Sequence, residues 1–425
     1  MIKYDVIVIG GGPAGLMAAG QAAGRGMKVT LLEKKYLPAR KLGITGKGRC
    51  NLTNIAQIND FLSSFGKGAK FMRFALGRFA NHDLISFFNE LGVKTVVERG
   101  GRVFPFAQDA QVVVRTLINW AKNQGVEIRA NTRVTRIITE NGRVSGAIIK
   151  DSRKRPDGSE TAQEKLLSAH SIVIATGGSS YPATGSTGDG YALAEEMGHG
   201  IVSVHPALVP LETRGSTAQK MQGLSLRNVQ AEIFVHEKKQ ARGFGEMLFT
   251  HFGVSGPIIL TMSKTAVQAL NQNQKVTLTI DLKPGVTHTQ LKSRIARVMH
   301  EQGKKKLINI LKDFLPLKMI PVFVEQSGID QEKQGNLVTA GEQKKLRMWC
   351  KELQLEISGY RSFNEAIITS GGVKLPEVNP KTMESRKVQG LYFAGEVLDI
   401  DADTGGFNLQ AAFSTGWVAG ISAGL

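Results

Sequence analysis

The stretch Val6–Gly15, "VIVIGGGPAG", decides the fold. A β-branched apolar run, typical of a buried parallel strand, leads into Gly10, Gly12 and Gly15, which have GxGxxG spacing and precede an alanine-rich helical segment. In such a βαβ unit the glycines permit a sharp turn, close approach of the backbone to a pyrophosphate, and packing of the helix on the strand. Glu33 ends the next strand-like run, 18 residues after Gly15, near the offset at which an acid binds a ribose. The stretch therefore predicts an α/β, Rossmann-like domain that binds an adenine dinucleotide.

Three later segments favour FAD over NAD as that dinucleotide. Residues 171–178, "SIVIATGG", and 390–399, "GLYFAGEVLD", each read as a strand running into glycines, and 404–416, "TGGFNLQAAFSTG", places a glycine pair before a helix. A Rossmann start, an ATG strand, a late AG-acid strand and a terminal helix occur in this order in FAD proteins with glutathione-reductase-like topology. No second dinucleotide fingerprint follows a strand. Either NAD(P)H therefore docks transiently at the flavin, or O2 is the oxidant.

The chain changes character at about residue 200, which predicts an insertion in the FAD domain. Residues 205–281 read as strands, and from Thr287 to about Lys351 the pattern is helical and rich in lysine. We expect a discontinuous FAD-binding domain at 1–198 and 361–425, a β-rich substrate domain at 199–285 and 350–360, and a helical insert at 286–349.

Composition argues against several classes of protein. No apolar run reaches the roughly 18 residues of a membrane span, and no cleavage site follows the first strand, so we expect a cytoplasmic protein. The two cysteines, Cys50 and Cys350, are far apart in the sequence, and the eight histidines lack ligand spacing. We therefore expect neither a disulfide framework nor a metal site.

The chain is strongly basic, with 54 Lys and Arg against 36 Asp and Glu, a net charge of +18. The cations are spread widely and form no polybasic tail, and aromatic residues make up only 7 %, which argues against a base-stacking surface. The sequence therefore favours a solvated basic surface over one that binds nucleic acid, and no nucleic-acid partner is expected.

Long motifs give the chain a family resemblance that covers nearly its whole length. The most specific are "RKLGITGKGRCNLTN" (40–54), "ATGGSSYPATGSTGDGYALAEEMGH" (175–199) and "FGEMLFTHFGVSGPIIL" (244–260). With them the chain resembles the YhiN/BaiN-type family of bacterial NAD(P)/FAD-dependent oxidoreductases. The resemblance implies noncovalent FAD in a glutathione-reductase-type domain, with an inserted β-barrel-like domain and a helical subdomain. The activities it implies are reduction of an activated C=C bond or oxidation of a small amine.

The resemblance also implies which residues contact the cofactor. Those at the pyrophosphate, ribose and adenine are Gly10, Gly12, Pro13, Ala14, Gly15, Glu33, Lys34 and Val134. Those of the 40–54 loop that wrap the pyrophosphate and flavin are Arg40, Lys41, Gly46, Gly48, Arg49, Cys50 and Asn51. Those along the cofactor or at its flavin end are Thr176, Gly177, Gly395, Glu396, Asp399, Gly406, Phe407, Asn408 and Leu409.

Catalytic groups are harder to assign, because the flavin carries the redox chemistry and the protein supplies positioning and a proton. His251 and Tyr181 are the candidates. The alternative for His251 is a hydrogen-bonded structural histidine, and the alternative for Tyr181 is an aromatic ring packed over the cofactor. Cys50 has no second thiol nearby in the sequence, so we interpret it as packing at the cofactor and not as a redox thiol.

Three functions follow from these patterns. The first is an FAD-dependent oxidoreductase that acts on a small organic substrate, with the C=C reductase and the amine oxidase as alternatives. The second is a flavin-dependent RNA-modifying enzyme, which the net charge of +18 permits. The third is a flavin-binding module without catalysis, against which the large insertion argues because it offers a substrate pocket. The substrate and the oligomeric state do not follow from the sequence.

Overall fold

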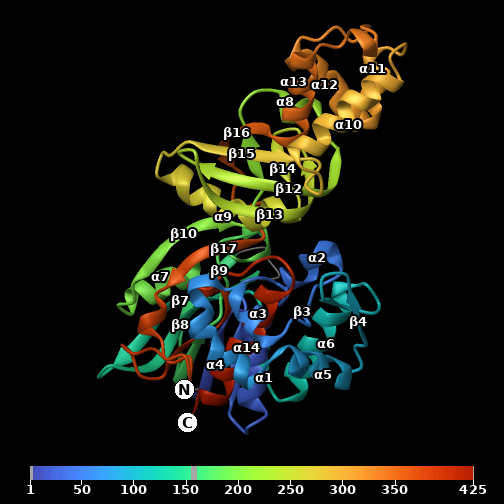
Figure 1. Ribbon diagram of the computed structural model, residues 1–425. Helices are drawn as coiled ribbons and strands as arrows, with labels where there is room; N and C mark the ends of the chain where they lie inside the picture. Colours follow the sequence, from blue (N-terminus) through green and yellow to red (C-terminus); the bar gives the residue numbers. More distant parts are fainter. Residues whose placement is uncertain (1–2, 155–159, 425) are drawn as a thin grey trace. The chain divides into compact units, whose positions relative to one another are not determined.

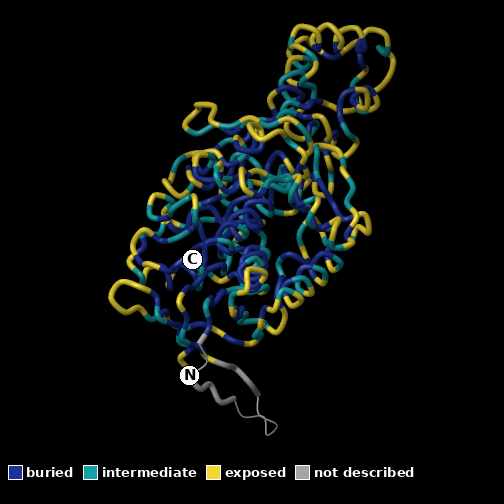
Figure 2. The backbone as a smooth tube through the Cα atoms, turned by 90° about the horizontal axis from the view of Figure 1, so that it is seen from below, coloured by how far each residue is buried: buried dark blue, intermediate teal, exposed yellow. Residues whose placement is uncertain are grey.

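The computed structural model describes residues 3–154 and 160–424 (Figure 1). The chain forms two compact units: Met1–His205 together with Ile367–Leu425, and Pro206–Ala366 between them. Each unit has its own apolar core, and the buried stretches of backbone are dark blue in Figure 2. The structure divides the chain into two units, and residues 206–366 form one of them. The predicted boundaries between a β-rich substrate domain and a helical insert therefore stay a prediction.

The first unit is built on a seven-stranded sheet whose central strands are parallel. β1 (Lys3–Ile9) pairs in parallel with β2 (Val29–Leu32) and with β9 (Glu160–Ile174), and β18 (Leu391–Phe393) pairs in parallel with β9. β2 and β18 are buried along their whole length, which explains their continuous apolar runs. The segments that follow these parallel strands meet at one edge of the sheet. The predicted Rossmann-like architecture is thus confirmed. The strand order is β6–β2–β1–β9–β8–β7, with β6 (Glu127–Arg129), β7 (Thr132–Glu140) and β8 (Arg143–Lys154).

Small residues let two helices of this unit pack closely. α1 (Pro13–Ala23) begins directly after the glycines and packs against α14 (Phe407–Ser422), the last helix of the chain. A Cβ atom on Gly416 would lie 2.4 Å from the Ala14 carbonyl oxygen, so only glycine permits this approach. The packing brings the two ends of the chain together, as Figure 1 shows for α1 in blue and α14 in red.

The remaining elements of the first unit surround this core. α6 (Ala110–Asn123) packs on α1 and starts at Asp109, whose carboxylate accepts a hydrogen bond from Gln111 N at 2.8 Å. Three short strands form a separate sheet, β3–β5–β4, and β10 pairs with β17. The bounds are α2 (Thr45–Gly48), β3 (Thr53–Asn54), α3 (Ile58–Ser63), α4 (Ala69–Arg78), α5 (Asn81–Glu90), β4 (Thr95–Glu98), β5 (Arg102–Pro105), α7 (Asp189–Glu196), β10 (Ile201–Ala207) and β17 (Ile368–Val373).

The second unit contains a closed barrel in the order β11–β14–β13–β12–β15–β16. Buried and partly exposed residues alternate along its strands, as in β15, where Val276, Leu278 and Ile280 are buried. The predicted β-barrel-like insertion is thereby confirmed. The strands are β11 (Leu211–Thr213), β12 (Ser225–Val235), β13 (Lys238–Phe249), β14 (Gly253–Ser255), β15 (Val276–Asp281) and β16 (Leu353–Tyr360).

The sequence predicted strands throughout residues 205–281. This prediction is wrong for one segment, because the helix α9 (Pro257–Asn271) lies among them. Gly256 precedes the helix and Pro257 is its first residue, a usual start for a helix. An apolar run such as "PIIL" looks alike in a buried strand and in a buried helix, which is why its pattern misleads. The other helices of this unit are α8 (Thr217–Lys220), α10 (His288–Glu301), α11 (Leu307–Ile310), α12 (Ile320–Ser327) and α13 (Ala340–Lys351).

A buried histidine joins distant segments of the first unit. His199 Nε2 lies 2.8 Å from Ser385 Oγ, and its Nδ1 lies 3.1 Å from Glu377 Oε2. Ser385 Oγ also accepts hydrogen bonds from Lys387 N and Val388 N. The serine hydroxyl therefore holds a turn, and the cluster is structural despite its likeness to a catalytic triad.

Burial lowers the pKa of His199, although Glu377 opposes the shift. The unfolded chain takes up the proton at higher pH than the folded one, so this stabilisation is complete above the unfolded pKa of about 6.5 and is lost as the pH falls through the folded pKa. We expect the melting temperature to drop between pH 7.5 and 5.5 by more in the wild type than in His199→Gln. Thermal scans at several pH values measure this difference, and equal slopes would contradict it.

Candidate functional site

The glycines after β1 leave open space at the start of α1. A Cβ atom on Gly10, whose φ is +102°, would lie 2.6 Å from Ala175 O, and one on Gly15 would lie 1.9 Å from Gly10 O. A Cβ on Gly12, by contrast, would meet nothing within 4 Å. Gly12 precedes α1 and offers no side chain to its first N–H groups. Free N–H groups, the positive end of the helix dipole and open space together fit a pyrophosphate.

Glu33 stands at the end of β2, as the sequence indicates, and holds two backbone segments. Its Oε2 accepts a hydrogen bond from Gly11 N at 2.8 Å and its Oε1 accepts one from Lys35 N at 2.7 Å. Burial raises the pKa of this carboxyl group. The neighbouring Lys34 forms an ion pair with Asp189, with Nζ and Oδ2 2.9 Å apart. Contacts of Glu33 and Lys34 with a ribose stay predictions.

The loop 40–54 owes its shape to left-handed backbone. Gly46, Lys47, Gly48 and Cys50 all have positive φ, between 58° and 82°. Two of its cations have partners within the protein itself. The Arg49 guanidinium forms an ion pair with Glu98 at 2.9 Å and lies over the Phe104 ring. Arg40, in turn, lies over the Tyr36 ring.

Two side chains at the end of this loop differ in chemical character. Cys50 is fully buried, and burial raises the pKa of its thiol to about 12, so the thiol stays protonated and weakly nucleophilic at neutral pH. Cys350 lies in the second unit and is likewise buried. Asn51 Oδ1 is buried and accepts no hydrogen bond from the part of the chain that the structure describes. Such an orphaned acceptor fits a donor supplied by a ligand.

Cys50→Ala is expected to retain bound flavin and at least about half of the turnover, because a protonated buried thiol adds packing and no redox chemistry. Flavin absorbance per protein and the steady-state rate measure both properties. Loss of turnover with flavin still bound would show that the thiol takes part in the reaction.

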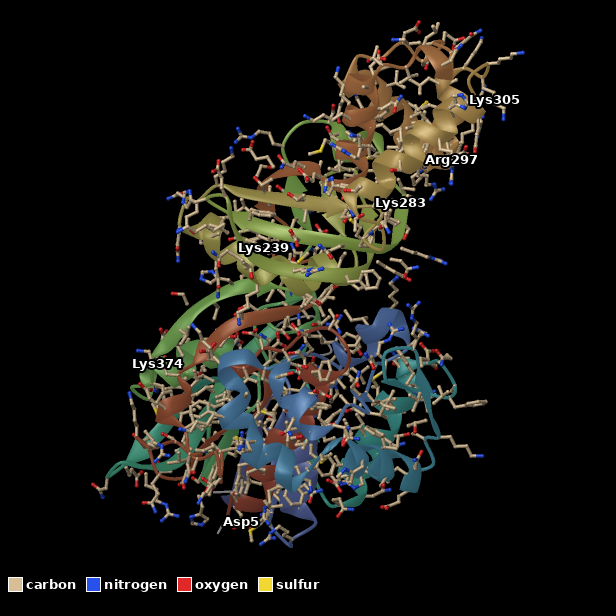
Figure 3. The ribbon with its side chains drawn as sticks, in the orientation of Figure 1. Asp5, Lys239, Lys283, Arg297, Lys305 and Lys374 are labelled. Carbon is tan, nitrogen blue, oxygen red and sulfur yellow. The ribbon has the colours of Figure 1, made fainter. Side chains whose placement is uncertain are left out.

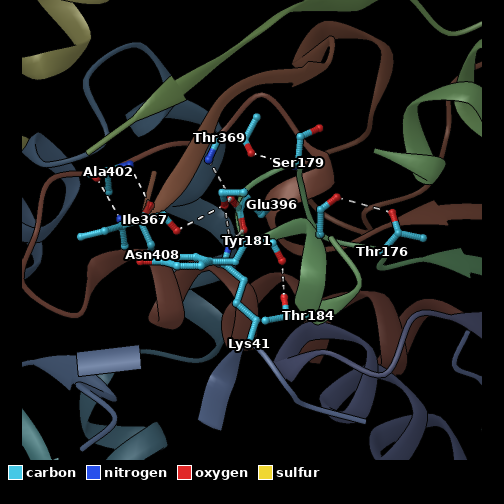
Figure 4. A network of polar contacts seen from close by, with 12 residues as sticks. Lys41, Thr176, Ser179, Tyr181, Thr184, Ile367, Thr369, Glu396, Ala402 and Asn408 are labelled. Atoms are coloured by element: carbon cyan, nitrogen blue, oxygen red, sulfur yellow. Dashed lines mark hydrogen bonds and ion pairs between the residues drawn. The ribbon is translucent and has the colours of Figure 1, made fainter. Parts of the chain in front are cut away.

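Glu396 is the centre of a polar network at the sheet edge (Figure 4). Its Oε1 accepts from Thr369 N at 2.7 Å and from Ser180 Oγ at 3.1 Å. Its Oε2 forms an ion pair with Lys41 Nζ at 2.8 Å, and Lys41 Nζ also donates to Ser180 Oγ at 2.6 Å. The network joins the 40–54 loop with the segments after β9 and β18 and at the start of β17. Gly395 N donates to Thr415 Oγ1 at 2.9 Å, so contact of Gly395 with the cofactor stays a prediction.

The residues expected at the flavin end lie around the start of α14. Gly406 has φ +102°, and a Cβ there would lie 2.3 Å from Thr53 O. Asn408 Oδ1 accepts from Ala402 N at 2.9 Å, and its Nδ2 donates to Ala402 O at 2.8 Å. The asparagine thus holds the preceding loop in shape. Phe407 packs edge-to-face with Phe61.

Other predicted contacts lie at or near strand ends. Thr176 and Gly177 follow β9, and Gly177 has φ +73°. Val134 lies in β7 and pairs with Ile149 of β8. Asp399 N donates to Val373 O at 3.1 Å, and Leu409 is half-buried in α14. Contacts of these residues with the cofactor stay predictions.

The two catalytic candidates differ in setting. Tyr181 is half-buried beside the Glu396 network, and its φ of +53° is unusual for a residue with a side chain (Figure 4). Its carbonyl oxygen accepts from Thr184 Oγ1 at 2.7 Å. His251 belongs to the second unit, where it is exposed between β13 and β14 and packs edge-to-face with Phe252. Their catalytic roles stay predictions.

Sequence reasoning missed Tyr191, which lies in α7. Its ring is buried, and its hydroxyl has no hydrogen-bond partner among the described residues. Burial raises the pKa of this phenol, and the charges of Glu396 and Asp399 add to the shift. A neutral, buried hydroxyl without a partner in the described chain can offer a proton or a hydrogen bond to a ligand. The only signal in the sequence is the turn "GSTGDGY" that precedes it.

Across residues 3–154 and 160–424, no group of three or more His, Cys, Asp or Glu side chains is placed to hold a metal ion. No helix within those residues has the length and apolar character to cross a membrane.

Comparison with known proteins identifies the family of this chain. The model of the HI0933-like protein Rossmann domain family matches residues 4–422. The chain belongs to this family. A relative named 3-dehydro-bile acid delta(4,6)-reductase, from Clostridium scindens, is 32 % identical over 418 residues, 98 % of each chain. A ribosomal RNA dihydrouridine synthase from Haemophilus influenzae is 29 % identical over 426 residues, 99 % of each chain. The predicted membership of the YhiN/BaiN-type flavoprotein family is confirmed, and the HI0933-like chain is an FAD-dependent oxidoreductase.

Solved structures agree on the fold of the HI0933-like chain. A 3-ketosteroid delta1-dehydrogenase from Sterolibacterium denitrificans matches with a TM-score of 0.56 and 14 % identity, covering 99 % of each chain. From the sequence we expected no nucleic-acid partner. The comparisons do not support this expectation, because one relative is named a ribosomal RNA dihydrouridine synthase.

Proposed function

We propose that this chain is an FAD-dependent reductase of a C=C bond conjugated to a carbonyl group. The names of two full-length relatives carry the proposal. In a 3-dehydro bile acid with Δ4,6 unsaturation the double bonds are conjugated to the 3-ketone, and dihydrouridine is uridine whose ring C=C bond, conjugated to a carbonyl, has been saturated. Both changes add one hydride and one proton to the same kind of bond. The amine oxidase considered from the sequence has no such support.

The residues at the sheet edge suit FAD. In this proposal the open space at Gly12 and the N-terminus of α1 receive the pyrophosphate, and Asn51 Oδ1 accepts a hydrogen bond from the cofactor. The cofactor, when bound and reduced, supplies the hydride, and NAD(P)H is the proposed source of its electrons. The Glu396 network holds the 40–54 loop against the strand ends.

A proton must also reach the carbon next to the carbonyl. Tyr181 is the proposed donor, because its strained backbone lies beside the Glu396 network, where strain often accompanies function. The Tyr191 hydroxyl, buried and unpartnered within the described chain, is the reserve donor. Tyr181→Phe with bound flavin retained and reduction of the substrate slowed would separate the two.

A uridine in RNA is the second candidate substrate. The specific observation in its favour is the charge of the helical part of the second unit. Residues 283–351 hold 14 Lys and Arg against six Asp and Glu, so the cations are less widely spread than our reading of the sequence held. A phosphate backbone is the natural partner of such a segment.

An anaerobic experiment tests the proposed function. The purified flavoprotein is reduced with NADPH or NADH and then mixed with a 3-oxo-Δ4 steroid or with ribosomal RNA lacking dihydrouridine. We expect the flavin absorbance to return with one of them and the product to gain 2 Da by mass spectrometry, the mass of two hydrogens. No reoxidation by either compound, together with peroxide formed from a small amine in air, would overturn the proposal.

A further inference from the structure

The helical part of the second unit carries a disproportionate share of the charge. Residues 283–351 have a net charge of +8, from 14 basic and six acidic residues, whereas the whole chain has +18. The other 356 residues therefore carry +10, and the charge per residue in the segment is about four times higher. A solvated surface of mixed sign does not concentrate charge in this way.

The acids of this segment are mostly engaged. Glu342 lies 2.9 Å from Lys333 Nζ, Glu332 lies 2.5 Å from Lys306 Nζ, and Asp313 accepts from Gln302 Nε2. Several exposed lysines of the segment have no carboxylate partner among the described residues. They are Lys292, Lys304, Lys305, Lys312, Lys344 and Lys345. Their field is therefore not cancelled locally.

The cations are held on a rigid element. The buried side of α10 consists of Leu291, Ile295, Val298 and Met299, which fixes the rest of the helix toward solvent. α10 has 14 residues and is about 20 Å long. Figure 3 shows Lys305, Arg297 and Lys283 following one another along one edge of the segment. A row of this length spans several phosphates of a nucleic acid strand.

We propose that α10 and the turn that follows it bind the phosphodiester backbone of RNA. The inference rests on the proposed function, for which it favours the uridine substrate. The contacts are to phosphates, so the segment supplies affinity, and recognition of the base is left to the flavin site. An anionic membrane is the competing partner, since Leu317 and Leu337 in the same segment are exposed.

The test compares two charge reversals of equal size in the full-length flavoprotein. The first variant carries Lys292→Glu, Lys304→Glu and Lys305→Glu. The matched control carries Arg25→Glu, Lys94→Glu and Lys122→Glu, three exposed cations of the first unit whose side chains form no ion pair with the described residues. The probe is a fluorescein-labelled RNA stem-loop of about 30 nucleotides, and anisotropy is followed from 50 to 200 mM salt.

We expect the α10 variant to bind at least about tenfold more weakly and to reduce the salt slope by about two, since each lost phosphate contact removes about 0.7–0.9. The control is expected to change by less than about threefold. Equal weakening of both variants, unchanged binding of the α10 variant, or tighter binding of phosphatidylglycerol vesicles than of RNA would each overturn the proposal.

A second readout separates this inference from the proposed function. Dihydrouridine in ribosomal RNA is measured after incubation with each variant, and reduction of the 3-oxo-Δ4 steroid is measured in parallel. Salt-sensitive RNA binding through α10 without any dihydrouridine would support the surface and remove uridine as the substrate. Equal dihydrouridine formation by the wild type and the α10 variant would overturn the surface and leave the reductase proposal standing.

Discussion

Gly12→Ala is expected to weaken flavin binding strongly while leaving the protein folded. The backbone of Gly12 has φ −74°, which any residue adopts, and an added Cβ meets no protein atom within 4 Å. The free energy of unfolding should therefore fall by at most about 1 kcal/mol, because alanine is a poorer residue than glycine at the position before a helix. In the proposed complex the same space holds the pyrophosphate, so the methyl group weakens FAD binding by about 10- to 100-fold.

Gly15→Ala is the matched control for this prediction. Its Cβ would lie 1.9 Å from Gly10 O, so the substitution disrupts the contact of α1 with β1 and lowers both stability and flavin content. Thermal melting of the flavin-free proteins and FAD titration by fluorescence quenching measure the two effects separately. If Gly12→Ala bound FAD like the wild type, the pyrophosphate would have to lie elsewhere.

The second large effect is expected at the Glu396 network. Glu396→Ala removes the acceptor of three hydrogen bonds and leaves the Lys41 ammonium, only 20 % exposed, without its carboxylate. Breaking a pair that is buried only in part is expected to lower the free energy of unfolding by about 2–3 kcal/mol, which is less than the cost for a fully buried pair. Urea denaturation of the flavin-free protein measures the change without interference from the cofactor.

Two comparisons make this second prediction specific. Lys41→Met combined with Glu396→Ala should cost less than the sum of the single variants, because neither charge is then left alone. Arg115→Ala, which removes an exposed ion pair to Asp109 with a separation of 4.0 Å, should cost less than about 0.5 kcal/mol. Additive losses at Lys41 and Glu396 would contradict the pairing.

The local parts of the fold were predictable from the sequence, and the distant contacts were not. Gly10, Gly12, Gly15 and Glu33 lie within one βαβ unit, where spacing along the chain determines position in space. Lys41 and Glu396 are 355 positions apart, and no pattern in a single sequence pairs two such residues. Both stand in recognisable motifs, but their mutual ion pair became visible only in the structure.

Three further misses have definite physical causes. α9 was read as strand because its apolar run has no period that distinguishes a buried helix from a buried strand. The basic character of 283–351 was diluted by counting charge over the whole chain, whereas electrostatic potential depends on local density. Tyr191 was overlooked because a buried tyrosine is ordinarily core, and only the missing hydrogen bond in the described chain marks it.

The chain leaves the first unit at the end of β10 and returns at the start of β17, two strands that pair with each other. Both attachment points of residues 206–366 are therefore held together by the first unit itself. A segment joined in this way can be exchanged without altering the order of the parallel sheet. Residues 206–366 and the parallel sheet of the first unit can therefore change independently of each other. Such modularity suits a family in which bile acids and ribosomal RNA both appear in the names of full-length relatives.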